Sequence, residues 1–419
     1  MTQRVTEADP TDGAGPHPVA RPATVGDAAE VVRAARAAGT AVYPRGGGTH
    51  LHLGGPPTGP GTVVDVRDLC RVIDYPARDL TVTVQAGVTV AALAGLLAAE
   101  GQELPVDVPN PEAATLGGAL ATNTSGPRRL SRGTLRDYLI GVSFLSDEAV
   151  EVKGGGRVVK NVAGYDLMKL HVGALGTLGL LTQVTLKLTP KAEARAFVAF
   201  GLNSAAVGPT LDRLHASHAR PGVVELLNAA AARRLGVALP AHDEWVIVVG
   251  FEEKRVTVEY QVATLKAELM AAPVRDLTEF RGPAANALLS ALTQDLAEPA
   301  GGVSFQAGVL PSRLAAVALE AAAPPGVAVH AHALVGVIYG HLPADVSQAD
   351  AANLLASLTP RAGSVTVRRC PPAWRAVLPG RLPAGVNLDL MRAVKHALDP
   401  ADLFNPGRLF RDPSPTDSP

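Results

Sequence analysis

Cysteine is scarce in this sequence, and its scarcity excludes several kinds of site. The 419 residues contain only two cysteines, Cys70 and Cys370. Two thiols do not make a disulfide framework, and on their own they cannot hold an iron–sulfur cluster or a structural zinc ion. Any such cluster would therefore belong to a partner protein.

The sequence also lacks an excess of charge of either sign. Lysine and arginine number 38, aspartate and glutamate 39, and the formal net charge is −1. A chain with this balance has no overall field that attracts nucleic acid or anionic lipid. Binding to nucleic acid is therefore not expected.

Long apolar runs are missing as well. The first 17 residues mix acidic residues, proline and glycine without the apolar centre of a signal peptide. No stretch approaches the roughly 20 apolar residues of a membrane-spanning helix. We therefore expect a soluble, cytoplasmic protein without a transmembrane segment, attached to the inner membrane, if at all, through partners.

What is present is the composition of an ordinary globular protein. Hydrophobic residues make up 47% of the chain and charged residues 18%, which is typical of a folded chain. A chain of 419 residues exceeds what one hydrophobic core usually organises. We therefore expect two domains.

The first part of the chain alternates between helix and strand patterns. Thr24 and Asp27 form a capping-box pattern at the start of a helix that Gly39 ends. Strands are expected at 40–44, 62–66, 81–87 and 181–188, and a second helix runs from Thr89 to Gly101.

The pattern changes near Pro190, where we place a domain boundary. The second part predicts an antiparallel sheet with helices on one face. An amphipathic helix is expected at 387–398, and we interpret 1–17 and 412–419 as loose tails. The strands of the second part are expected at 196–202, 222–228, 245–251, 303–310, 327–339 and 363–369, with a helix at 254–271.

Two glycine-rich stretches are candidates for binding a phosphate group. PRGGGTHLHLGG (44–55) follows a predicted strand, and PNPEAATLGGALATNTSG (109–126) combines glycine with small hydroxyl and amide side chains. Glycine lets the backbone approach a ligand and turn its N–H groups toward phosphate oxygens. Each stretch alone is equally well an ordinary turn, and neither is a Rossmann fingerprint or a P-loop.

Three further stretches complete a pattern that resembles a known superfamily. They are GTLRDYLIGVSF (133–144), GGRVVKNVAGYDLMKLHVGALGTLGLLTQVTLKLTP (155–190) and LDPADLFNPGR (398–408). With the two glycine-rich stretches they resemble the FAD-binding PCMH-type flavoproteins, the vanillyl-alcohol oxidase and p-cresol methylhydroxylase superfamily. The resemblance covers nearly the whole chain.

The resemblance implies an α+β fold. A two-subdomain FAD-binding domain would span 18–190, and a ferredoxin-like α+β cap domain for substrate or partner would span 195–385. A C-terminal helix and NPGR segment at 386–411 would return to the FAD domain.

The resemblance also implies non-covalent FAD, because His50 and His52 stand in a context similar to that of relatives that do not tether the flavin. Backbone groups of the first two stretches would surround the pyrophosphate. Arg136, Asp137 and Asp166 are alternatively members of a structural ion-pair network. The implied cofactor-binding residues are Pro44, Arg45, Gly46, Gly47, Gly48, Thr49, His50, Pro109, Thr115, Leu116, Gly117, Gly118, Thr122, Asn123, Gly126, Arg136, Asp137, Tyr165, Asp166, Gly179, Leu180, Leu181 and Asn405.

Two departures point within the superfamily to the FAD-binding GlcE-type subunit of glycolate oxidase. Relatives that act on D-2-hydroxy acids carry a metal-binding HxGxGNxH-like stretch and a Ser-x-Glu-His-Gly motif. Here the corresponding stretches are VHAHALVGVIYGHL and RLPAGVNLDL, so no metal is expected. The implied partners are a larger FAD-binding subunit and an iron–sulfur subunit, and the implied reaction oxidises a 2-hydroxy acid to a 2-oxo acid.

The catalytic residues are not fixed by these motifs. An alkoxide-forming step needs a base, and a substrate carboxylate needs a cation. Each candidate is alternatively structural. The candidate bases are His330, His332 and His341, and the candidate carboxylate-binding residues are Arg281, Arg368 and Arg381.

Two other functions remain open from the sequence. A stand-alone FAD oxidase of another substrate class would turn over without partners. A non-catalytic assembly subunit would keep the fold and bind FAD without turnover.

Overall fold

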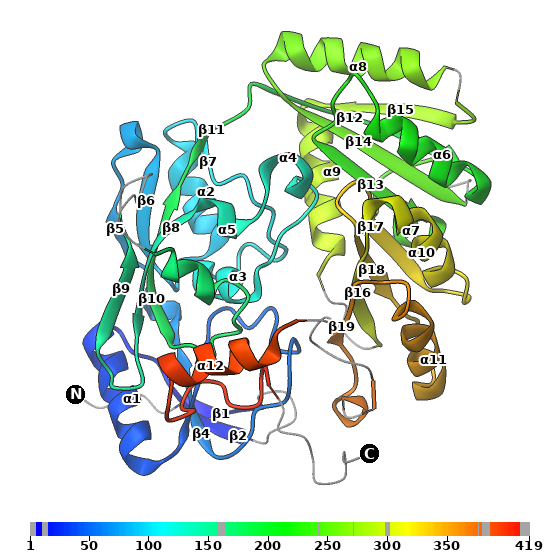
Figure 1. Cartoon of the computed structure of the whole chain (residues 1–419). Coiled ribbons are helices and arrows are strands. Elements are labelled where there is room, and N and C mark those ends of the chain that lie inside the picture. Colours follow the sequence, from blue (N-terminus) through cyan, green and yellow to red (C-terminus); the bar gives the residue numbers. More distant parts are fainter. Residues whose placement is uncertain are drawn as a thin grey trace. The chain divides into compact units, whose positions relative to one another are not determined.

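The computed structural model describes residues 6–10, 16–156, 165–240, 244–270, 272–297, 302–375, 377–378 and 386–410 (Figure 1). The chain divides into two compact units. Unit 1 comprises residues 1–124, 134–190 and 386–419, and unit 2 comprises 125–133 and 191–385. Both units combine helices with sheets, which confirms the predicted α+β class.

Unit 1 begins with a four-stranded sheet in the order β1-β2-β4-β3, in which β2, β4 and β3 run parallel. The predicted capping box of Thr24 and Asp27 starts α1, and Gly39 ends it at φ 63°. The position of β3 matters for function, because β3 ends where the first glycine-rich stretch begins. The elements are β1 (Thr6–Pro10), β2 (Pro16–Ala20), α1 (Val25–Ala38), β3 (Ala41–Arg45) and β4 (Gly61–Asp65).

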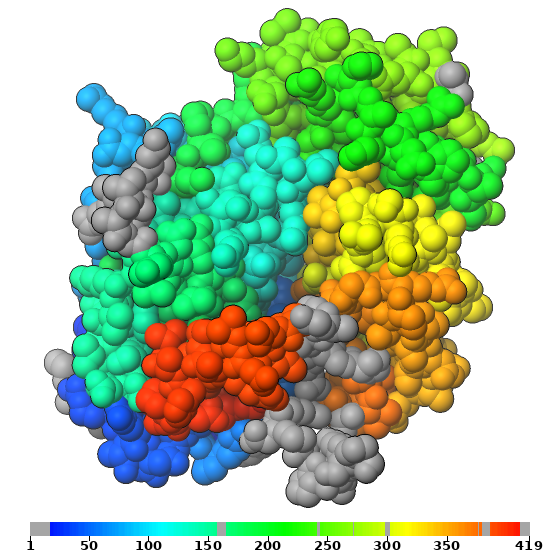
Figure 2. All heavy atoms as spheres, in the orientation of Figure 1, coloured from blue at the N-terminus to red at the C-terminus, as the bar shows by residue number. Residues whose placement is uncertain are grey.

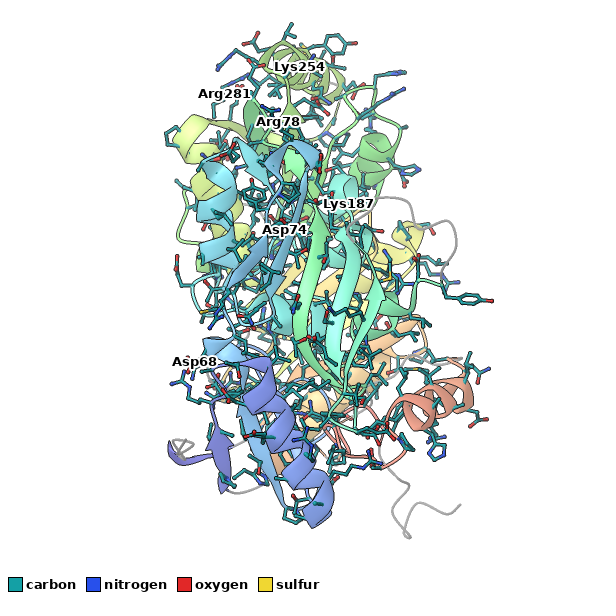
Figure 3. All side chains as sticks on the ribbon, turned by 90° about the vertical axis from the view of Figure 1, so that its left-hand side faces the viewer. Asp68, Asp74, Arg78, Lys187, Lys254 and Arg281 are labelled. Carbon is teal, nitrogen blue, oxygen red and sulfur yellow. The ribbon has the colours of Figure 1, made fainter. Side chains whose placement is uncertain are left out.

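A second, antiparallel sheet of unit 1 has the order β5-β6-β10-β8-β9 and is seen face-on in Figure 3. Leucines of α2, α3 and α5 pack against β6, β8 and β10 in one hydrophobic core. The strands are β5 (Val72–Asp74), β6 (Thr81–Gln85), β8 (Leu139–Leu145), β9 (Glu151–Gly155) and β10 (Leu180–Lys187), with the short pair β7 (Gln102–Glu103) and β11 (Thr189–Pro190). The helices are α2 (Val90–Ala98), α3 (Leu116–Thr122) and α5 (Leu135–Tyr138).

The C-terminal segment returns to unit 1. After α12 (Leu388–Leu398), the backbone N–H of Asn405 donates to the carbonyl of Val42 at 3.0 Å, and the N–H of Val42 donates to the carbonyl of Leu403 at 2.8 Å. Residues 403–405 therefore lie beside β3. This arrangement agrees with the returning helix that the sequence resemblance implied.

Unit 2 is built on one eight-stranded antiparallel sheet in the order β15-β12-β14-β13-β17-β18-β16-β19. Each half is a ferredoxin-like β-α-β-β-α-β unit, and the halves join through the second strand of each, β13 and β17. The strands are β12 (Ala194–Leu202), β13 (Val223–Asn228), β14 (Trp245–Glu253), β15 (Arg275–Arg281), β16 (Ser304–Gly308), β17 (Ala328–His332), β18 (Val337–His341) and β19 (Ser364–Arg369).

Helices cover both faces of this sheet, whereas the sequence predicted helices on one face. The crossover helices α6, α8, α10 and α11 share the larger core with one face, and α7 and α9 pack on part of the other. The rest of that second face carries polar side chains. The helices are α4 (Arg129–Arg132), α6 (Ser204–His215), α7 (Ala229–Arg234), α8 (Arg255–Leu269), α9 (Gly282–Asp295), α10 (Leu314–Ala321) and α11 (Gln348–Leu358).

Three other predictions need correction. The single strand expected at 327–339 is the hairpin of β17 and β18, because Gly336 at φ 81° turns the chain. Part of the expected tail, residues 6–10, forms β1 paired with β2. Residues 125–133, expected in the first domain, cluster with unit 2.

Candidate functional site

The two glycine-rich stretches meet in unit 1, and glycine is what allows them to meet. A Cβ atom on Gly47 would lie 1.7 Å from the carbonyl oxygen of Ala113. A Cβ atom on Gly46 would lie 2.1 Å from Oγ1 of Thr115. Backbone therefore packs directly on backbone where the loop after β3 crosses the chain before α3.

The second stretch is held in place by contacts with the end of β6, a strand of the five-stranded sheet. Thr115 caps α3, its hydroxyl accepting from the N–H of Gly118 at 3.2 Å. The N–H of Gly117 donates to the carbonyl of Ala86 at 2.8 Å, and a Cβ atom on Gly117 would come within 2.8 Å of the Ala86 side chain. Contacts within the protein therefore hold this loop in its position.

A pocket with about 770 Å³ of atom-free space, open solvent included, lies between these loops, the 175–181 turn and the C-terminal segment. Most of the residues implied to bind FAD from the first two stretches line it. Those that line it are Pro44, Arg45, Gly46, Gly47, Gly48, Thr49, His50, Thr115, Gly117, Gly118, Thr122, Leu180, Leu181 and Asn405.

The chemistry of this lining suits a dinucleotide with a diphosphate and a flat ring. Arg45 and Arg408 contribute positive charge, and no carboxylate occurs among the described residues that line the pocket. The remaining wall is apolar, from residues such as Leu51, Val66 and Leu175. The arginines would match a charged diphosphate, and the apolar wall would match an apolar ring, within one pocket.

Asn405 illustrates how the C-terminal segment takes part. Its Nδ2 donates to the carbonyl of Leu175 at 2.7 Å, and its backbone adopts φ 44°. The same segment brings Arg408 to the pocket, where Nη1 donates to the carbonyl of Gly55 at 2.9 Å. Residues some 350 positions apart in the chain are therefore joined at one site.

The other implied FAD residues do not line this pocket. Asp137 accepts from the backbone N–H of Thr134 at 2.8 Å, and Arg136 donates to the carbonyl of Lys169 at 3.1 Å. Both side chains therefore have backbone partners within the fold. The remaining residues outside the lining are Pro109, Leu116, Asn123, Gly126, Tyr165, Asp166 and Gly179.

The surroundings of three of these residues are clear. Tyr165 is 88% exposed and precedes the 3-10 turn 167–171. Gly179, at φ 141°, would place a Cβ atom 2.7 Å from the Phe144 ring. Gly126 belongs to unit 2.

Sequence analysis missed several residues of the pocket. The missed residues are Leu51, Leu53, Val66, Ala86, Ala121, Leu175, Gly176 and Arg408. Gly176 and Arg408 stand in motifs that had already been singled out, so those motifs carried a usable signal. The apolar residues carry none, because nothing local separates a pocket leucine from a core leucine.

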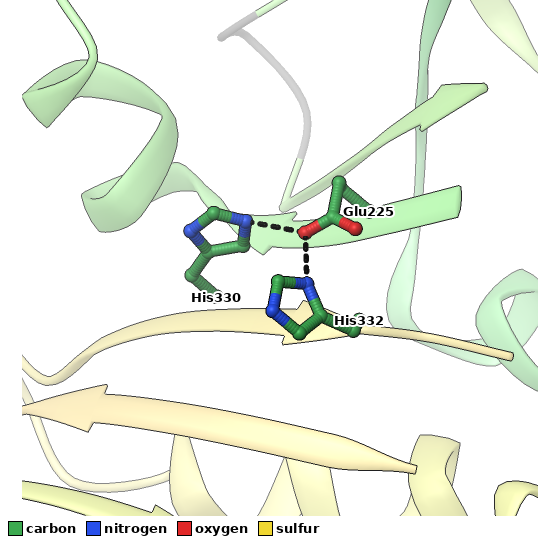
Figure 4. Close-up of side chains that lie close together, drawn as sticks. All are labelled: Glu225, His330 and His332. Atoms are coloured by element: carbon green, nitrogen blue, oxygen red, sulfur yellow. Dashed lines mark hydrogen bonds and ion pairs between the residues drawn. The ribbon is translucent and has the colours of Figure 1, made fainter. Parts of the chain in front are cut away.

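A second cluster lies on the polar part of the unit 2 sheet. Glu225 on β13 faces His332 and His330 on β17 (Figure 4), because Glu225 pairs with His332 in the register of the two strands. Nε2 of His330 and Nδ1 of His332 each lie 2.7 Å from Oε2 of Glu225. All three side chains are buried, being at most 1% exposed.

Asp295, the last residue of α9, extends this cluster. Its Oδ2 lies 3.1 Å from Nδ1 of His330, and its Oδ1 lies 3.2 Å from Nε of Arg234. Burial opposes a charge on His330, but hydrogen bonds to Asp295 and Glu225 outweigh it and raise the pKa of His330 to about 9. The histidine contacts lower the pKa values of Glu225 and Asp295 despite their burial.

In the part of the chain that the structure describes, the side chains of Glu225, His330 and His332 also have a geometry that would admit a metal ion. Their ligand atoms lie within 4.8 Å of one another. Both histidines, however, already meet the same carboxylate oxygen at hydrogen-bonding distance. The arrangement is that of a hydrogen-bonded cluster.

The other catalytic candidates are His341, on which the charges of Asp295 and His330 act, and three arginines. Burial lowers the pKa of His341 to about 4, so it is neutral near pH 7. Arg281 (Figure 3) ends the edge strand β15 and pairs with Glu279. Arg368 lies over the ring of Tyr339, 5.5 Å from its centroid. Arg381 falls outside the described residues.

Comparison with known protein families identifies the cofactor of this chain. The FAD binding domain family matches residues 16–153, and the C-terminal domain of FAD linked oxidases matches residues 382–409. The chain belongs to the FAD-binding PCMH-type flavoprotein superfamily. Its cofactor is FAD, and residues of the FAD family match include both glycine-rich stretches of the pocket.

Individual members of the superfamily extend the comparison. The chain is 26% identical over 398 residues to "Glycolate oxidase subunit GlcD" of Bacillus subtilis, covering 88% of this chain and 83% of that protein. It is 36% identical over 151 residues to "Glycolate oxidase subunit GlcE" of Escherichia coli, covering 36% and 43%. It is 32% identical to "D-lactate dehydrogenase" of Archaeoglobus fulgidus, covering 41% and 39%.

These relationships place the protein among FAD-dependent oxidoreductases that act on CH–OH groups. Apart from the B. subtilis subunit, the match spans well under half the length of these curated relatives. A solved structure of alkyldihydroxyacetonephosphate synthase superposes with a TM-score of 0.69 at 17% identity, covering 94% of this chain and 78% of that one. That likeness concerns the fold. No helix among the described residues is long and apolar enough to span a membrane.

Proposed function

We propose that this protein is the FAD-binding subunit of a glycolate oxidase-type complex that oxidises a 2-hydroxy acid to a 2-oxo acid. The observation that carries the proposal is a pocket suited to FAD in a chain similar along most of its length to a glycolate oxidase subunit. The D-lactate dehydrogenase similarity supports the same substrate class. Glycolate is the proposed substrate.

Residues of unit 1 would hold the cofactor. Backbone groups of Gly46 to Gly48 and the start of α3 would meet the diphosphate, and Arg45 and Arg408 would balance its charge. The leucine-lined wall would take the ring system. Bound FAD supplies the two-electron acceptor of the reaction, while the chain positions it and excludes water.

A partner would receive the electrons. Two cysteines in 419 residues leave this chain unable to hold an iron–sulfur cluster of its own. Both glycolate oxidase relatives are named as subunits. We therefore propose a complex with a larger FAD-binding subunit and an iron–sulfur subunit.

Two measurements on protein from its own cells test the proposal. The tagged full chain should co-purify with a second flavoprotein and an iron–sulfur protein. The purified material should reduce an artificial dye with glycolate, D-lactate or D-2-hydroxyglutarate, and should not do so with acetate, which has no hydroxyl to oxidise. Dye reduction without any partner would indicate a stand-alone oxidoreductase, and bound FAD without dye reduction would indicate an assembly subunit.

A further inference from the structure

We propose that the edge strand β9 is the surface on which a second copy of this chain docks, the two β9 strands pairing antiparallel about a two-fold axis. The proposal concerns unit 1 alone and does not depend on the proposed oxidation. Strand β9 (Glu151–Gly155) is the last strand of the five-stranded sheet, and β8 is its one neighbour among the described strands (Figure 1).

Two hydrogen bonds show which backbone groups of β9 face away from β8. The N–H of Ser146 donates to the carbonyl of Val150 at 3.0 Å, and the N–H of Gly156 donates to the carbonyl of Ile140 at 3.0 Å. The register between these two ends has no bulge. In an antiparallel pair, hydrogen-bonded positions alternate with positions whose N–H and C=O groups point away from the neighbouring strand. The outward positions of β9 are therefore Glu151, Lys153 and Gly155.

The charges on this edge are complementary to themselves. Glu151 and Lys153 lie two positions apart and thus on one face of the strand. When two β9 strands pair with Val152 at the two-fold axis, Glu151 of each copy lies opposite Lys153 of the other. Both are outward positions, so each of these pairs also exchanges two backbone hydrogen bonds. One register therefore satisfies the backbone and the charges together.

Each of the two charged side chains lacks an ion-pair partner within the described part of the chain. Lys153 is exposed. Glu151 has a neutral partner, the hydroxyl of Thr182, which donates to its Oε1 at 3.0 Å. A lysine by itself on an edge strand would keep other strands away. A glutamate two residues earlier makes the same edge attractive to a copy of itself.

The opposite face of this edge is apolar and exposed. Val152 is 39% exposed. The 3-10 turn 167–171 packs on this face, since an added Cβ on Gly154 would lie 3.5 Å from the backbone nitrogen of Met168. Leu167 and Leu170 of that turn are 58% and 39% exposed. Two-fold pairing brings the two Val152 side chains together and removes apolar surface from water.

Three other edge strands lack this combination. Strand β5 has three residues and a register shift against β6. Strand β15 is interrupted at Asp276, whose φ is 49°, and its Glu279 already pairs with Lys266 and Arg281. Strand β19 carries two adjacent arginines and no carboxylate.

Charge reversal in the FAD-loaded full chain tests the register. We expect a dissociation constant in about the micromolar range for the wild type, because one short strand and a few side chains make a small interface. Glu151→Lys alone and Lys153→Glu alone each place like charges opposite one another. Each should weaken self-association about tenfold to 100-fold in analytical ultracentrifugation.

Mixing the two single variants supplies the sharpest comparison. In the mixed pair every acidic side chain lies opposite a basic one, so the mixture should associate about as well as the wild type does. Glu30→Lys and Arg33→Glu make the same charge changes at exposed positions of α1. These matched controls should associate as the wild type does.

Cysteine cross-linking tests the geometry, in a Cys70→Ser background because Cys70 is exposed. Val152→Cys should form an intermolecular disulfide on mild oxidation, since the Cα atoms of the two copies would lie about 4.5 Å apart. Val150→Cys is the matched control. Val150 is more exposed, at 54%, but the proposed register separates its two copies by about 14 Å.

Lys153→Pro separates docking from folding. The N–H of Lys153 points away from β8, so a proline there removes a hydrogen bond of the dimer and none of the sheet. This variant should keep its FAD and be monomeric.

A wild type that stays monomeric well above the micromolar range would overturn the proposal. So would a dimer that both charge reversals leave intact, because the copies would then meet at another surface. Equal cross-linking through positions 150 and 152, or a mixture of the single variants that does not associate, would show that the register is wrong.

Discussion

At the scale of single residues, the FAD pocket depends on positions where even one carbon atom does not fit. Gly47 is the extreme case, since its added Cβ would lie 1.7 Å from the carbonyl oxygen of Ala113. That oxygen belongs to backbone and cannot turn aside as a side chain can. Gly95, in α2, offers the opposite case, because an added Cβ there meets nothing within 4 Å.

Gly47→Ala should therefore push the two glycine-rich loops apart and weaken FAD retention. We expect purified Gly47→Ala to contain less than about a tenth of the wild-type flavin, a loss of about 1.4 kcal/mol or more in binding. The visible spectrum and the protein concentration give the flavin content. Gly95→Ala should purify fully loaded, and full loading of Gly47→Ala would show that the loop contact is not needed.

His171 gives unit 1 a predictable response to acid. Its ring is buried against Phe144, with centroids 4.3 Å apart, and burial lowers the pKa of His171 to about 4. The unfolded chain binds this proton near pH 6.5, earlier than the folded chain does. Unfolding is therefore favoured as the pH falls from about 6.5 to 4, and the free energy of unfolding drops by up to about 3 kcal/mol.

Denaturant unfolding of the wild type and His171→Gln at pH 7 and pH 5 measures this response. The variant is expected to lose less stability on acidification than the wild type does, whatever its stability at pH 7. Equal losses in both proteins would mean that His171 is not the group responsible.

At the scale of elements, a buried ion pair is among the contacts that hold the C-terminal segment on unit 1. Nζ of Lys395 pairs with Asp399 and donates to the carbonyls of Thr177 at 2.9 Å and Phe404 at 3.1 Å. Asp399 in turn accepts from the N–H of Leu403 at 3.0 Å. The pair thus positions the segment that carries Asn405, while α12 itself remains at the surface (Figure 2).

Lys395→Ala should destabilise unit 1 by about 3–5 kcal/mol, because it leaves the carboxylate of Asp399 buried and without its cation. The midpoint of chemical unfolding, followed by far-ultraviolet circular dichroism, gives the value. Arg392→Ala on the same helix removes an exposed pair with Asp389 and should change stability by less than about 1 kcal/mol. Similar effects of the two substitutions would contradict the assigned role of Lys395.

Elements defined by local signals were predictable, and those defined by distant partners were not. The helix from 25 to 38 was placed by its capping box and closing glycine, both within reach of the helix itself. Glu225 gave no signal, because only the pairing of β13 with β17 brings it to histidines more than 100 residues away. The hairpin at 333–336 was missed because its two strands follow one another closely in the sequence, with Gly336 as the turn residue.

The same distinction holds for the site. Glycine-rich stretches revealed the phosphate-facing part of the pocket, because close backbone approach requires that residue type. The resemblance implied that Arg136 and Asp137 bind FAD; in the fold Arg136 donates to the carbonyl of Lys169, and Asp137 accepts from the N–H of Thr134. Charged side chains have structural uses as readily as ligand-binding ones, and sequence alone does not separate the two.

At the scale of the whole molecule, each unit has its own core and its own candidate site. Unit 1 has the pocket proposed for FAD, and unit 2 has the buried Glu225, His330 and His332 cluster on its sheet. A flavin-dependent oxidation needs an electron acceptor and a group that removes a proton. Unit 1 has the pocket proposed for the electron acceptor.

The most direct test is the visible spectrum of the purified full chain without oxygen, before and after addition of glycolate or D-lactate. The account predicts a yellow protein whose flavin absorption bleaches with the hydroxy acid and returns when oxidant is added. A protein that takes up FAD but is not bleached by any 2-hydroxy acid, alone or with its partners, would contradict the proposed oxidation. A protein that refuses FAD would contradict the assignment of the pocket itself.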